Sequence, residues 1–293
     1  MLPNHPFGVR VPVKHGGPCM NRQTFFSELR KRDSGVFGTS LSQAQVDGAE
    51  AILDAASHLP IEYVAYLLST CYHETGAKMS PNRENLNYSV SGLLNTFSRA
   101  RISTAQAQAY GRSPGRAANQ VAIANAVYGG EWGRKNLGNT QPNDGWDFRG
   151  GGQSHTTGRT NYEKVKAATG VDVVGNSDLI LDPMVSATAL VQASVEGWYT
   201  GKKLSDYLPG DYRNARRVIN GIDKADTIAG YARAFEKALR AAGYPPAPKT
   251  PQIEMPVAPA PSAEQPKGDD VTYPTPQVIS ALLTIFKSLF RRS

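Results

Sequence analysis

Apolar residues recur at three- and four-residue spacing in several stretches of the chain, which is the pattern of helices that bury one face. The clearest stretch begins after Pro60 and ends at Gly76, a residue type that often terminates helices. Its apolar positions are Ile61, Val64, Ala65, Leu68, Cys71 and Tyr72. Ser42 is placed to cap a second run that extends to Ala56. Few segments alternate with the period of strands, so we expect a mainly α-helical domain with at most a short hairpin.

Three later stretches continue the helical pattern, over 161–168, 183–198 and 226–242. Another helix is expected to begin at Met20, which is therefore as suitable a natural start as Met1. The segment 129–158 is different, because glycine, asparagine and aspartate are concentrated there, which is typical of a loop. It is too long and too aromatic for a simple connector. Its aromatic residues either stack on sugar rings or anchor the loop to the core; they are Trp132, Trp146 and Phe148.

Composition divides the 293 residues into four parts. Residues 1–19 form an irregular lead-in with several prolines, and 20–244 form the globular domain. Residues 245–275 are rich in proline and predict an extended linker. Residues 276–293 carry Lys, Arg, Ser and Thr along one helical stripe and apolar residues elsewhere, which predicts a cationic amphipathic helix.

The formal net charge of +7 favours polyanionic partners such as nucleic acid, anionic lipid or an acidic cell-wall polymer. Basic residues are scattered and do not interleave with aromatic ones, so we expect no nucleic-acid partner. The two cysteines, Cys19 and Cys71, form no disulfide framework, and Cys71 is expected to be a small buried side chain. No secretory signal and no apolar run of about 18 residues is visible.

Two glutamates carry the candidate chemistry. Glu74 lies near the end of the helix after Pro60, where partial burial and the negative end of the helix dipole are expected to raise its pKa. A raised pKa suits a general acid. Glu84 follows a turn and is expected to be more solvated, so that it stays ionised and activates water. Two carboxyl groups with these roles cleave glycosidic bonds, whereas the alternative is a pair of ordinary surface glutamates.

Other familiar site patterns are absent from the sequence. His73 precedes Glu74, but a zinc-protease motif needs a second histidine where Ala77 stands, so we expect no metal. His73 is then an orienting group or a residue at the edge of the core. The glycines at 150–152 lack the spacing of a phosphate or dinucleotide loop, so no cofactor is expected either. His155 is either a loop residue without a task or a hydrogen-bonding group in a cleft.

Several ordered motifs resemble glycoside hydrolase family 19, in its bacterial and phage branch of chitinase-like endolysins. The matching segments are 65–76, 84–89, 123–130, 144–146, 157–162 and 218–221. The resemblance extends over roughly residues 20–244. It implies a bilobed, mostly helical, lysozyme-like fold with a cleft between the lobes. It also implies hydrolysis with inversion, in which an acid protonates the leaving oxygen and a carboxylate activates water.

Carried over by motif, the resemblance implies that Glu74 is the acid and Glu84 the second carboxylate. Thr157 matches a hydroxyl that helps to hold the attacking water. Sugar-binding positions implied by the same match are Asn125, Tyr128, Asn161 and Asn220, and further candidates for substrate contact are His73, Trp146 and His155.

The segment 149–155 departs from the family pattern. The family usually reads Arg-Gly-Arg-Gly followed by two apolar residues and Gln, whereas here Gly151 replaces an arginine and His155 replaces the Gln. The two apolar positions hold Gln153 and Ser154. A neutral histidine cannot donate and accept as an amide does, so subsite specificity or catalysis is expected to differ.

The expected function is therefore a monomeric phage or prophage endolysin that cuts the glycan strands of peptidoglycan. Chitin hydrolysis is an alternative, because both polymers are β-1,4-linked amino sugars, and a catalytically impaired wall-binding module is another. The lack of a visible signal suits accumulation in the host cytoplasm until release towards the cell wall. The tail 276–293 is expected either to contact an anionic membrane or to pack on a partner.

Overall fold

The computed structural model describes residues 20–245. The α-helices of this part are α1 (Arg22–Leu29), α2 (Gln43–Ala55), α3 (Ile61–Glu74), α4 (Val90–Thr96), α5 (Thr104–Tyr110), α6 (Gln120–Tyr128), α7 (Gly130–Leu137), α8 (Asp144–Asp147), α9 (Arg159–Thr169), α10 (Pro183–Glu196), α11 (Tyr212–Ala215) and α12 (Ala225–Ala241). Short 3₁₀ helices are η1 (Ser177–Leu181), η2 (Leu204–Asp206) and η3 (Arg216–Val218), and the strands are β1 (Asn82–Arg83) and β2 (Gly151–Gly152). The expectation of a mainly α-helical fold is confirmed.

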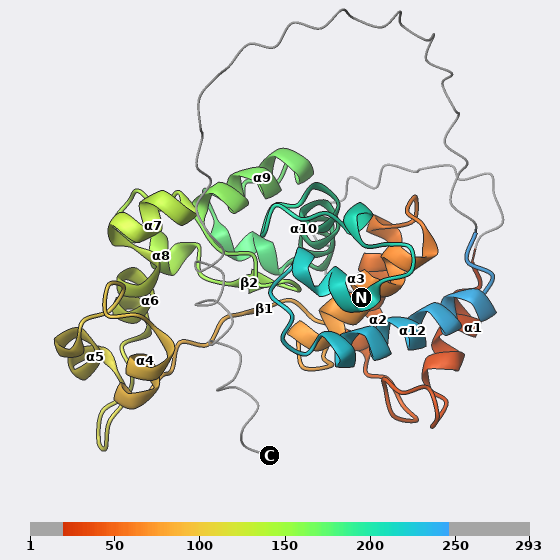
Figure 1. The fold of residues 1–293 in the computed structure, drawn as a ribbon, viewed down its shortest axis with the longest axis horizontal. Helices are drawn as coiled ribbons and strands as arrows, with labels where there is room; N and C mark the ends of the chain where they lie inside the picture. The colour runs from red at the N-terminus through yellow and green to blue at the C-terminus, as the bar shows by residue number, and fades with distance from the viewer. Residues whose placement is uncertain (1–19, 246–293) are drawn as a thin grey trace, which may run out of the picture.

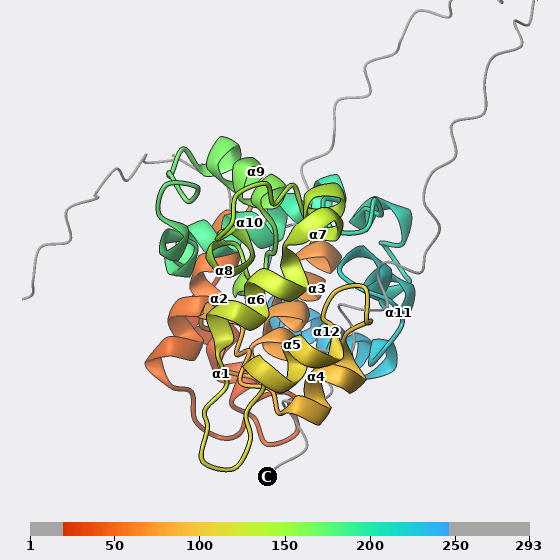
Figure 2. The ribbon, with the colours of Figure 1, turned by 90° about the vertical axis from the view of Figure 1, so that its left-hand side faces the viewer.

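The helices gather into two lobes, each with its own apolar core (Figure 1). In the first lobe α3 packs on α12, and α2 packs on α10, around large buried side chains such as Tyr66 and Phe235. The second lobe contains α4 to α7 around Leu93 and Ile123, and it faces the viewer in Figure 2. A third, smaller cluster joins α9, η1 and α10 around Phe148 and Tyr162.

The two strands connect segments that lie far apart in sequence. Asn82 pairs with Gly152 and Arg83 with Gly151 in antiparallel register. Both strands lie between the lobes (Figure 1). A local antiparallel bridge between Gly151 and Thr156 agrees with the expected short hairpin. The pairing of β1 with β2 is different, because it joins the segment after α3 to the segment after α8. This pairing fixes Glu84, the next residue, at the junction of the lobes.

Helix boundaries agree closely with the sequence where capping residues mark them. The Ser42 hydroxyl oxygen accepts from the N–H of Gln45 at the start of α2, and the Gln45 side-chain oxygen accepts from the N–H of Ser42, which completes a capping box. Helix α3 follows Pro60 and ends at Glu74, close to the predicted stop. Helix α10 ends at Gly197, whose φ of 78° is the left-handed conformation that glycine adopts without strain. Cys71 is fully buried in α3, as expected.

Two parts of the domain differ from the expectation. The segment 129–158 holds the helices α7 and α8 as well as loops, because its glycines allow the close packing described below. Helices α4 and α5 were not predicted, since each has only seven residues and shows little periodicity. The lead-in 1–19, the tail 276–293 and, apart from Pro245, the linker 245–275 lie outside the described residues. Within residues 20–245 no helix is long and apolar enough to span a bilayer.

Candidate active site

Glu74 occupies the last position of α3 and is buried in an ion pair. Its Oε1 lies 2.6 Å from Nη1 of Arg216, a residue of η3 that is equally inaccessible to solvent. The two side chains are only 3% and 4% exposed. A buried charge needs an opposite charge beside it, because the interior solvates ions poorly. Arg216 therefore supplies the counter-charge that lets Glu74 be ionised inside the first lobe.

The expected raised pKa of Glu74 is wrong for the free protein. Burial does act to raise this pKa, but the charge of Arg216 and its hydrogen bond, together with His73, lower it below the ordinary value. The sequence argument considered burial and the helix dipole but not this arginine, which is far away in the chain. The ion pair with Arg216 thus favours the ionised form of Glu74 when no substrate is bound.

Glu84 follows β1 and is buried as well, which corrects the expectation of a solvated carboxylate. The hydroxyl of Tyr128 donates towards both carboxyl oxygens, at 2.7 and 2.9 Å. The backbone N–H of Gly150 donates to Oε2 at 3.3 Å, and the N–H of Glu84 itself donates to the carbonyl of Gly150 at 2.8 Å. The carboxyl is thereby fixed between α6 and the segment before β2.

Burial raises the pKa of Glu84, and the hydrogen bonds from Tyr128 and Gly150 and the charge of Arg101 offset this only in part. Arg101 is an unusual neighbour. It is 6% exposed, its Nε donates to the carbonyl of Val127 at 2.7 Å, and its guanidinium carbon lies 3.9 Å from the ring centroid of Trp132. Among residues 20–245 its two terminal nitrogens have no hydrogen-bond partner, so the rings of Trp132, Phe97 and Tyr128 and the charge of Glu84 stabilise this buried cation.

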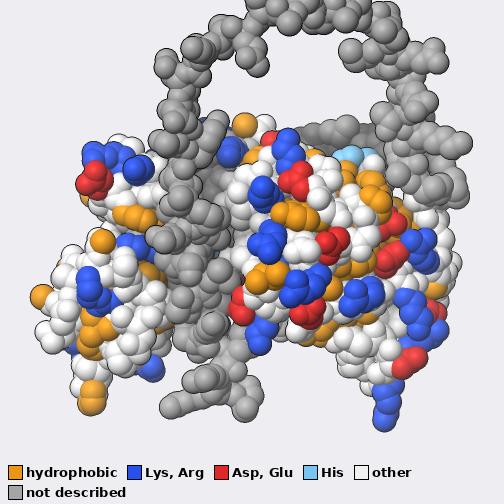
Figure 3. All heavy atoms as spheres, viewed as in Figure 1, with side chains coloured by type: hydrophobic (Ala, Val, Ile, Leu, Met, Phe, Trp, Pro, Cys, Tyr) orange, Lys and Arg blue, Asp and Glu red, His pale blue; other side chains and the backbone are white. Residues whose placement is uncertain are grey.

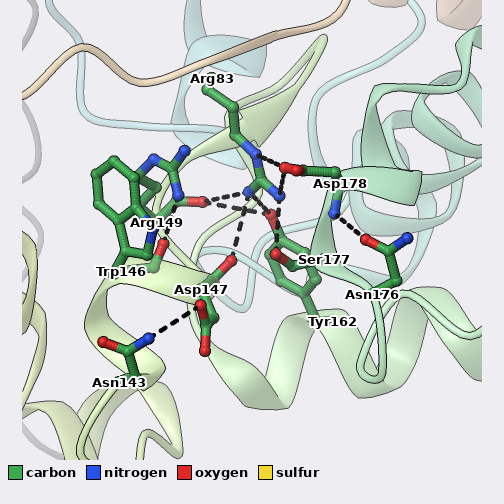
Figure 4. Close-up of polar contacts among 9 residues, drawn as sticks. All are labelled: Arg83, Asn143, Trp146, Asp147, Arg149, Tyr162, Asn176, Ser177 and Asp178. Atoms are coloured by element: carbon green, nitrogen blue, oxygen red, sulfur yellow. Dashed lines mark hydrogen bonds and ion pairs between the residues drawn. The ribbon is translucent and has the colours of Figure 1, made fainter. Parts of the chain in front are cut away.

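Arg83 holds the backbone on which Glu84 depends (Figure 4). Its guanidinium pairs with Asp178 at 2.8 Å, and Nη1 donates to the hydroxyl of Tyr162 at 2.7 Å and to the carbonyl of Arg149 at 3.3 Å. Because Gly150 is the next residue after Arg149, Arg83 fixes the peptide that contacts Glu84. Arg149 itself stacks on Trp146, with 3.5 Å between its guanidinium carbon and the ring centroid.

The glycine at 151 is explained by this arrangement. A Cβ on Gly151 would lie 2.7 Å from the hydroxyl of Tyr162 and 2.9 Å from Nη1 of Arg83. The guanidinium of Arg83 therefore occupies the space beside position 151, so a side chain on residue 151 would displace it.

A cavity of about 410 Å³ opens beside Glu84. It is lined by side chains from both lobes and from the segments between them, including Tyr128, Trp132, His155, Trp198, Tyr199 and Ile219. Glu74 does not line the cavity, but its charge acts on His155 and Tyr199, which do. Glu84 thus lines the cavity directly, whereas Glu74 is near enough to two of the lining residues to act on them by its charge.

Four further predicted site residues line this cavity: Thr157, His155, Asn161 and Asn220. Thr157 donates its hydroxyl proton to the carbonyl of His155 at 2.9 Å, which leaves its oxygen as an acceptor. Asn161 donates to the carbonyl of Thr157 at 2.9 Å. The Asn220 side chain accepts from the N–H of Gly221 at 2.9 Å. These contacts place a hydroxyl acceptor on the same cavity wall as Glu84.

The other predicted substrate contacts lie away from the cavity wall. Asn125 donates to the side chain of Asn143 and accepts from the N–H of Trp146, so it joins α6 to α8. Trp146 is partly buried against the second core, with Arg149 over its ring. His73 is half-buried beside Glu74, and burial lowers its pKa. Their roles in substrate binding remain predictions.

The three residues 153–155, which depart from the expected motif, each form side-chain hydrogen bonds. The amide nitrogen of Gln153 donates to the carbonyls of Gly48 and Met79, at 3.1 and 2.8 Å, while its oxygen has no partner. The Ser154 hydroxyl lies 2.8 Å from that of Tyr199. His155 adopts a φ of 52°, and its Nε2 lies 2.7 Å from Oδ1 of Asn82, so this nitrogen is the donor. Burial lowers the pKa of His155, which keeps the ring neutral.

Sequence reasoning missed three arginines that control the carboxyl groups, Arg216, Arg101 and Arg83. No spacing signal could have found them, because each meets its glutamate or its peptide through tertiary packing. Arg83 is the exception in one respect, since it is adjacent to Glu84 in the chain. Among residues 20–245 no three His, Cys, Asp or Glu side chains are grouped so that they could hold a metal ion.

No family model matches the chain. A stretch of 120 residues is 36% identical to a protein of Haemophilus influenzae described as a glycosyl hydrolase family 19 domain-containing protein. The match covers 39% of this chain and 55% of that protein, so the chain spans about half the length of the curated relative. This similarity and the mainly helical fold support a relationship between the chain and glycoside hydrolase family 19, at the level of the family alone.

Proposed function

We propose that the protein is a cell-wall glycosidase that hydrolyses β-1,4 bonds in the glycan strands of peptidoglycan. The observation that carries the proposal is a pair of buried carboxyl groups held by different partners, Glu74 by Arg216 and Glu84 by the Tyr128 hydroxyl and the Gly150 N–H. Two carboxyl groups in different surroundings can divide the acid and base functions between them. The similarity to a glycosyl hydrolase supports the same class of reaction.

In the proposed reaction Glu74 protonates the leaving oxygen, while Glu84 removes a proton from the attacking water. The hydroxyl oxygen of Thr157 accepts a hydrogen bond from the other O–H of this water, which becomes the new anomeric hydroxyl, since the Thr157 proton is donated to the carbonyl of His155. The tyrosine hydroxyl of Tyr128 and the N–H of Gly150 hold the Glu84 carboxylate in one orientation. Attack from the face opposite the leaving group inverts the anomeric configuration.

Glu74 must gain a proton before it can act as the acid. In the free protein Arg216 keeps it ionised. A bound glycan changes this balance where its leaving-group oxygen reaches Glu74, because that oxygen accepts a hydrogen bond only from the protonated carboxyl. This hydrogen bond raises the pKa of Glu74 in the complex. Glu74 thus takes up the proton that it donates in the reaction when the substrate binds.

The test is digestion of purified peptidoglycan by the full chain and by the variants Glu74→Gln and Glu84→Gln. We expect each variant to lose at least about 100-fold in the release of reducing ends, since positioned acids and bases contribute about that much or more. Glu131→Gln is the matched control, because Glu131 is an exposed residue of α7 outside the cavity wall. Mass spectrometry of the products identifies the bond that is cut.

Chitin oligomers digested in parallel distinguish the substrates. Hydrolysis of chitin without hydrolysis of peptidoglycan would make the protein a chitinase. If the wild type binds the wall but releases no products from either polymer, it is a binding module.

The proposed setting is lysis of a bacterial cell by a phage or prophage endolysin, which the resemblance of the motifs supports. Membrane contact through residues 276–293 forms part of this proposal and is supported by the cationic amphipathic pattern of that segment. Leakage from vesicles of anionic lipid, measured with the full chain and with a chain truncated at residue 275, tests it. Equal leakage would contradict the membrane role.

A further inference from the structure

One wall of the cavity is cationic. Arg134 and Lys135, in the last turn of α7, and Lys164, in α9, all line it. We refer to these three residues as the cationic wall. Glu84 is the carboxyl group among the lining residues, so the lining carries an excess of two positive charges even with Glu84 ionised. Figure 3 shows blue side chains gathered over α7 at the upper left of the molecule.

The backbone of the cationic wall is rigid. Gly138 ends α7 with a φ of 69°, and a Cβ there would lie 2.1 Å from Oγ1 of Thr160 in α9. The side chain of Asn139 donates to the carbonyl of Tyr128 at 2.9 Å and accepts from the N–H of Arg159 at 2.8 Å. The end of α7 and the start of α9 are thereby packed directly on each other and on the helix that carries Tyr128.

The charges of the cationic wall are not neutralised by the protein. Within residues 20–245, none of the three side chains forms an ion pair. Arg159, on the same helix as Lys164, provides the contrast, because Asp144 binds it through two hydrogen bonds of 2.9 and 2.5 Å. Glu131 also belongs to α7, but it does not line the cavity. The positive charge of the wall is therefore available to a ligand.

Lys164 is also fixed in its direction. Its Nζ lies 5.8 Å from the ring centroid of Trp198, another lining residue, within the range of a cation–π contact. The indole nitrogen of Trp198 in turn donates to Glu196 at 2.7 Å. An aromatic surface with an ammonium group above it suits a sugar ring that carries a carboxylate.

We propose that the cationic wall binds carboxylates of the glycan and so selects an anionic amino-sugar polymer over a neutral one. This inference rests on the proposed function, because it names the charge class of substrate for the same cavity. Chitin, a polymer of N-acetylglucosamine, carries no charge and gains nothing from three cations. A peptidoglycan strand carries carboxylates on its peptide stems, and on its lactyl groups where the stems have been removed.

The experiment measures binding of three soluble fragments of equal sugar length to the full chain carrying Glu84→Gln, which prevents turnover. One fragment has peptide stems, the second has free lactyl carboxylates, and the third is a neutral N-acetylglucosamine oligomer. Calorimetry at low and at physiological salt gives the affinity for each. We expect at least one anionic fragment to bind about five- to thirtyfold more tightly than the neutral one, and this ratio to fall with salt.

The decisive variant adds Arg134→Gln, Lys135→Gln and Lys164→Gln, and the ratio is then expected to approach one. The matched control removes the same charge elsewhere, through Arg32→Gln, Arg233→Gln and Lys237→Gln, all exposed residues outside the cavity wall. The ratio should be retained in this control. Which anionic fragment keeps the advantage identifies stem or lactyl carboxylates as the ligand.

Equal affinity for charged and neutral fragments, no binding of any fragment, or the same loss in both triple variants would overturn the inference. Hydrolysis by the wild type is scored separately. A wild type that prefers anionic fragments but cleaves none of the polymers contradicts the proposed function and leaves the charge selection in place.

Discussion

The ion pair between Glu74 and Arg216 gives the sharpest prediction about stability. The substitution Arg216→Met keeps an apolar side chain of similar length but removes the charge that faces Glu74. Both side chains are almost completely buried, at 3% and 4% exposure, and their closest atoms are 2.6 Å apart. The variant therefore leaves a carboxylate in the core without a counter-charge.

The expected cost is about 3–5 kcal/mol at pH 7, which is typical when one partner of a buried pair is removed. Stabilities of whole domains are about 5–15 kcal/mol, so the variant is expected to be marginally folded at neutral pH. In the wild type the pKa of Glu74 is lowered by folding. The ionised carboxylate therefore stabilises the folded state at pH values above its unfolded pKa, about 4.3, and this stabilisation is lost as the pH falls through the folded pKa.

The variant reverses the sign of that dependence. Without Arg216, burial dominates and raises the pKa of Glu74, so its charge costs free energy at pH 7 and the cost disappears as the carboxyl is protonated. The difference in unfolding free energy between wild type and variant should therefore shrink between pH 7 and about pH 4. Urea denaturation at several pH values, followed by far-UV circular dichroism, measures it.

Two variants serve as controls. Arg213→Met removes an exposed ion pair with Asp226 and should cost less than about 1 kcal/mol, because the two side chains are 51% and 81% exposed. Glu74→Gln combined with Arg216→Met should recover much of the loss, since no unpaired charge is left. A deficit below about 1 kcal/mol at pH 7 for Arg216→Met alone, or one that does not change with pH, would refute this account of the pair.

Three further predictions concern the cavity and its supports. Tyr128→Phe removes the hydrogen bond that lowers the pKa of Glu84, so the acidic limb of the pH–rate profile should move to higher pH; an unmoved limb argues against Glu84 as the base. Gly145→Ala should lower the free energy of unfolding by about 1–3 kcal/mol, because its Cβ would lie 2.5 Å from a backbone oxygen. Gly230→Ala, in the open middle of α12, should raise it by about 0.5–1 kcal/mol. The midpoint of thermal unfolding reports both changes. Arg83→Met should lower kcat more than it raises KM, since it loosens the peptide beside Glu84, and Arg83→Lys should restore part of the loss; a change in KM alone would contradict that positioning role.

Local patterns accounted for the longer helices and for several residues that line the cavity. The run after Pro60 predicted α3 and placed Glu74 at its end, and Ser42 predicted the start of α2. The motif that begins at Glu84 and the one around Thr157 identified residues that do line one cavity. These successes depend on contacts within a few residues or on motifs carried as a unit, which is the information a single sequence holds.

The electrostatics could not be predicted in the same way. The pKa of Glu74 is lowered where a raised value was expected, and Glu84 is buried with a raised pKa where a solvated carboxylate was expected, because both depend on contacts that form only on folding. The pairing of β1 with β2 was missed for the same reason, since two residues per strand are too few to show a period. Helix α8, a single turn, lies in a segment whose glycines favoured a loop.

The position of Arg83 opposite Gly151 has a consequence for protein engineering. The two residues face each other across β1 and β2, and a Cβ on Gly151 would lie 2.9 Å from Nη1 of Arg83. A side chain at position 151 and the guanidinium of Arg83 therefore compete for the same space. A design that enlarges one of the two residues has to shorten the other in the same step.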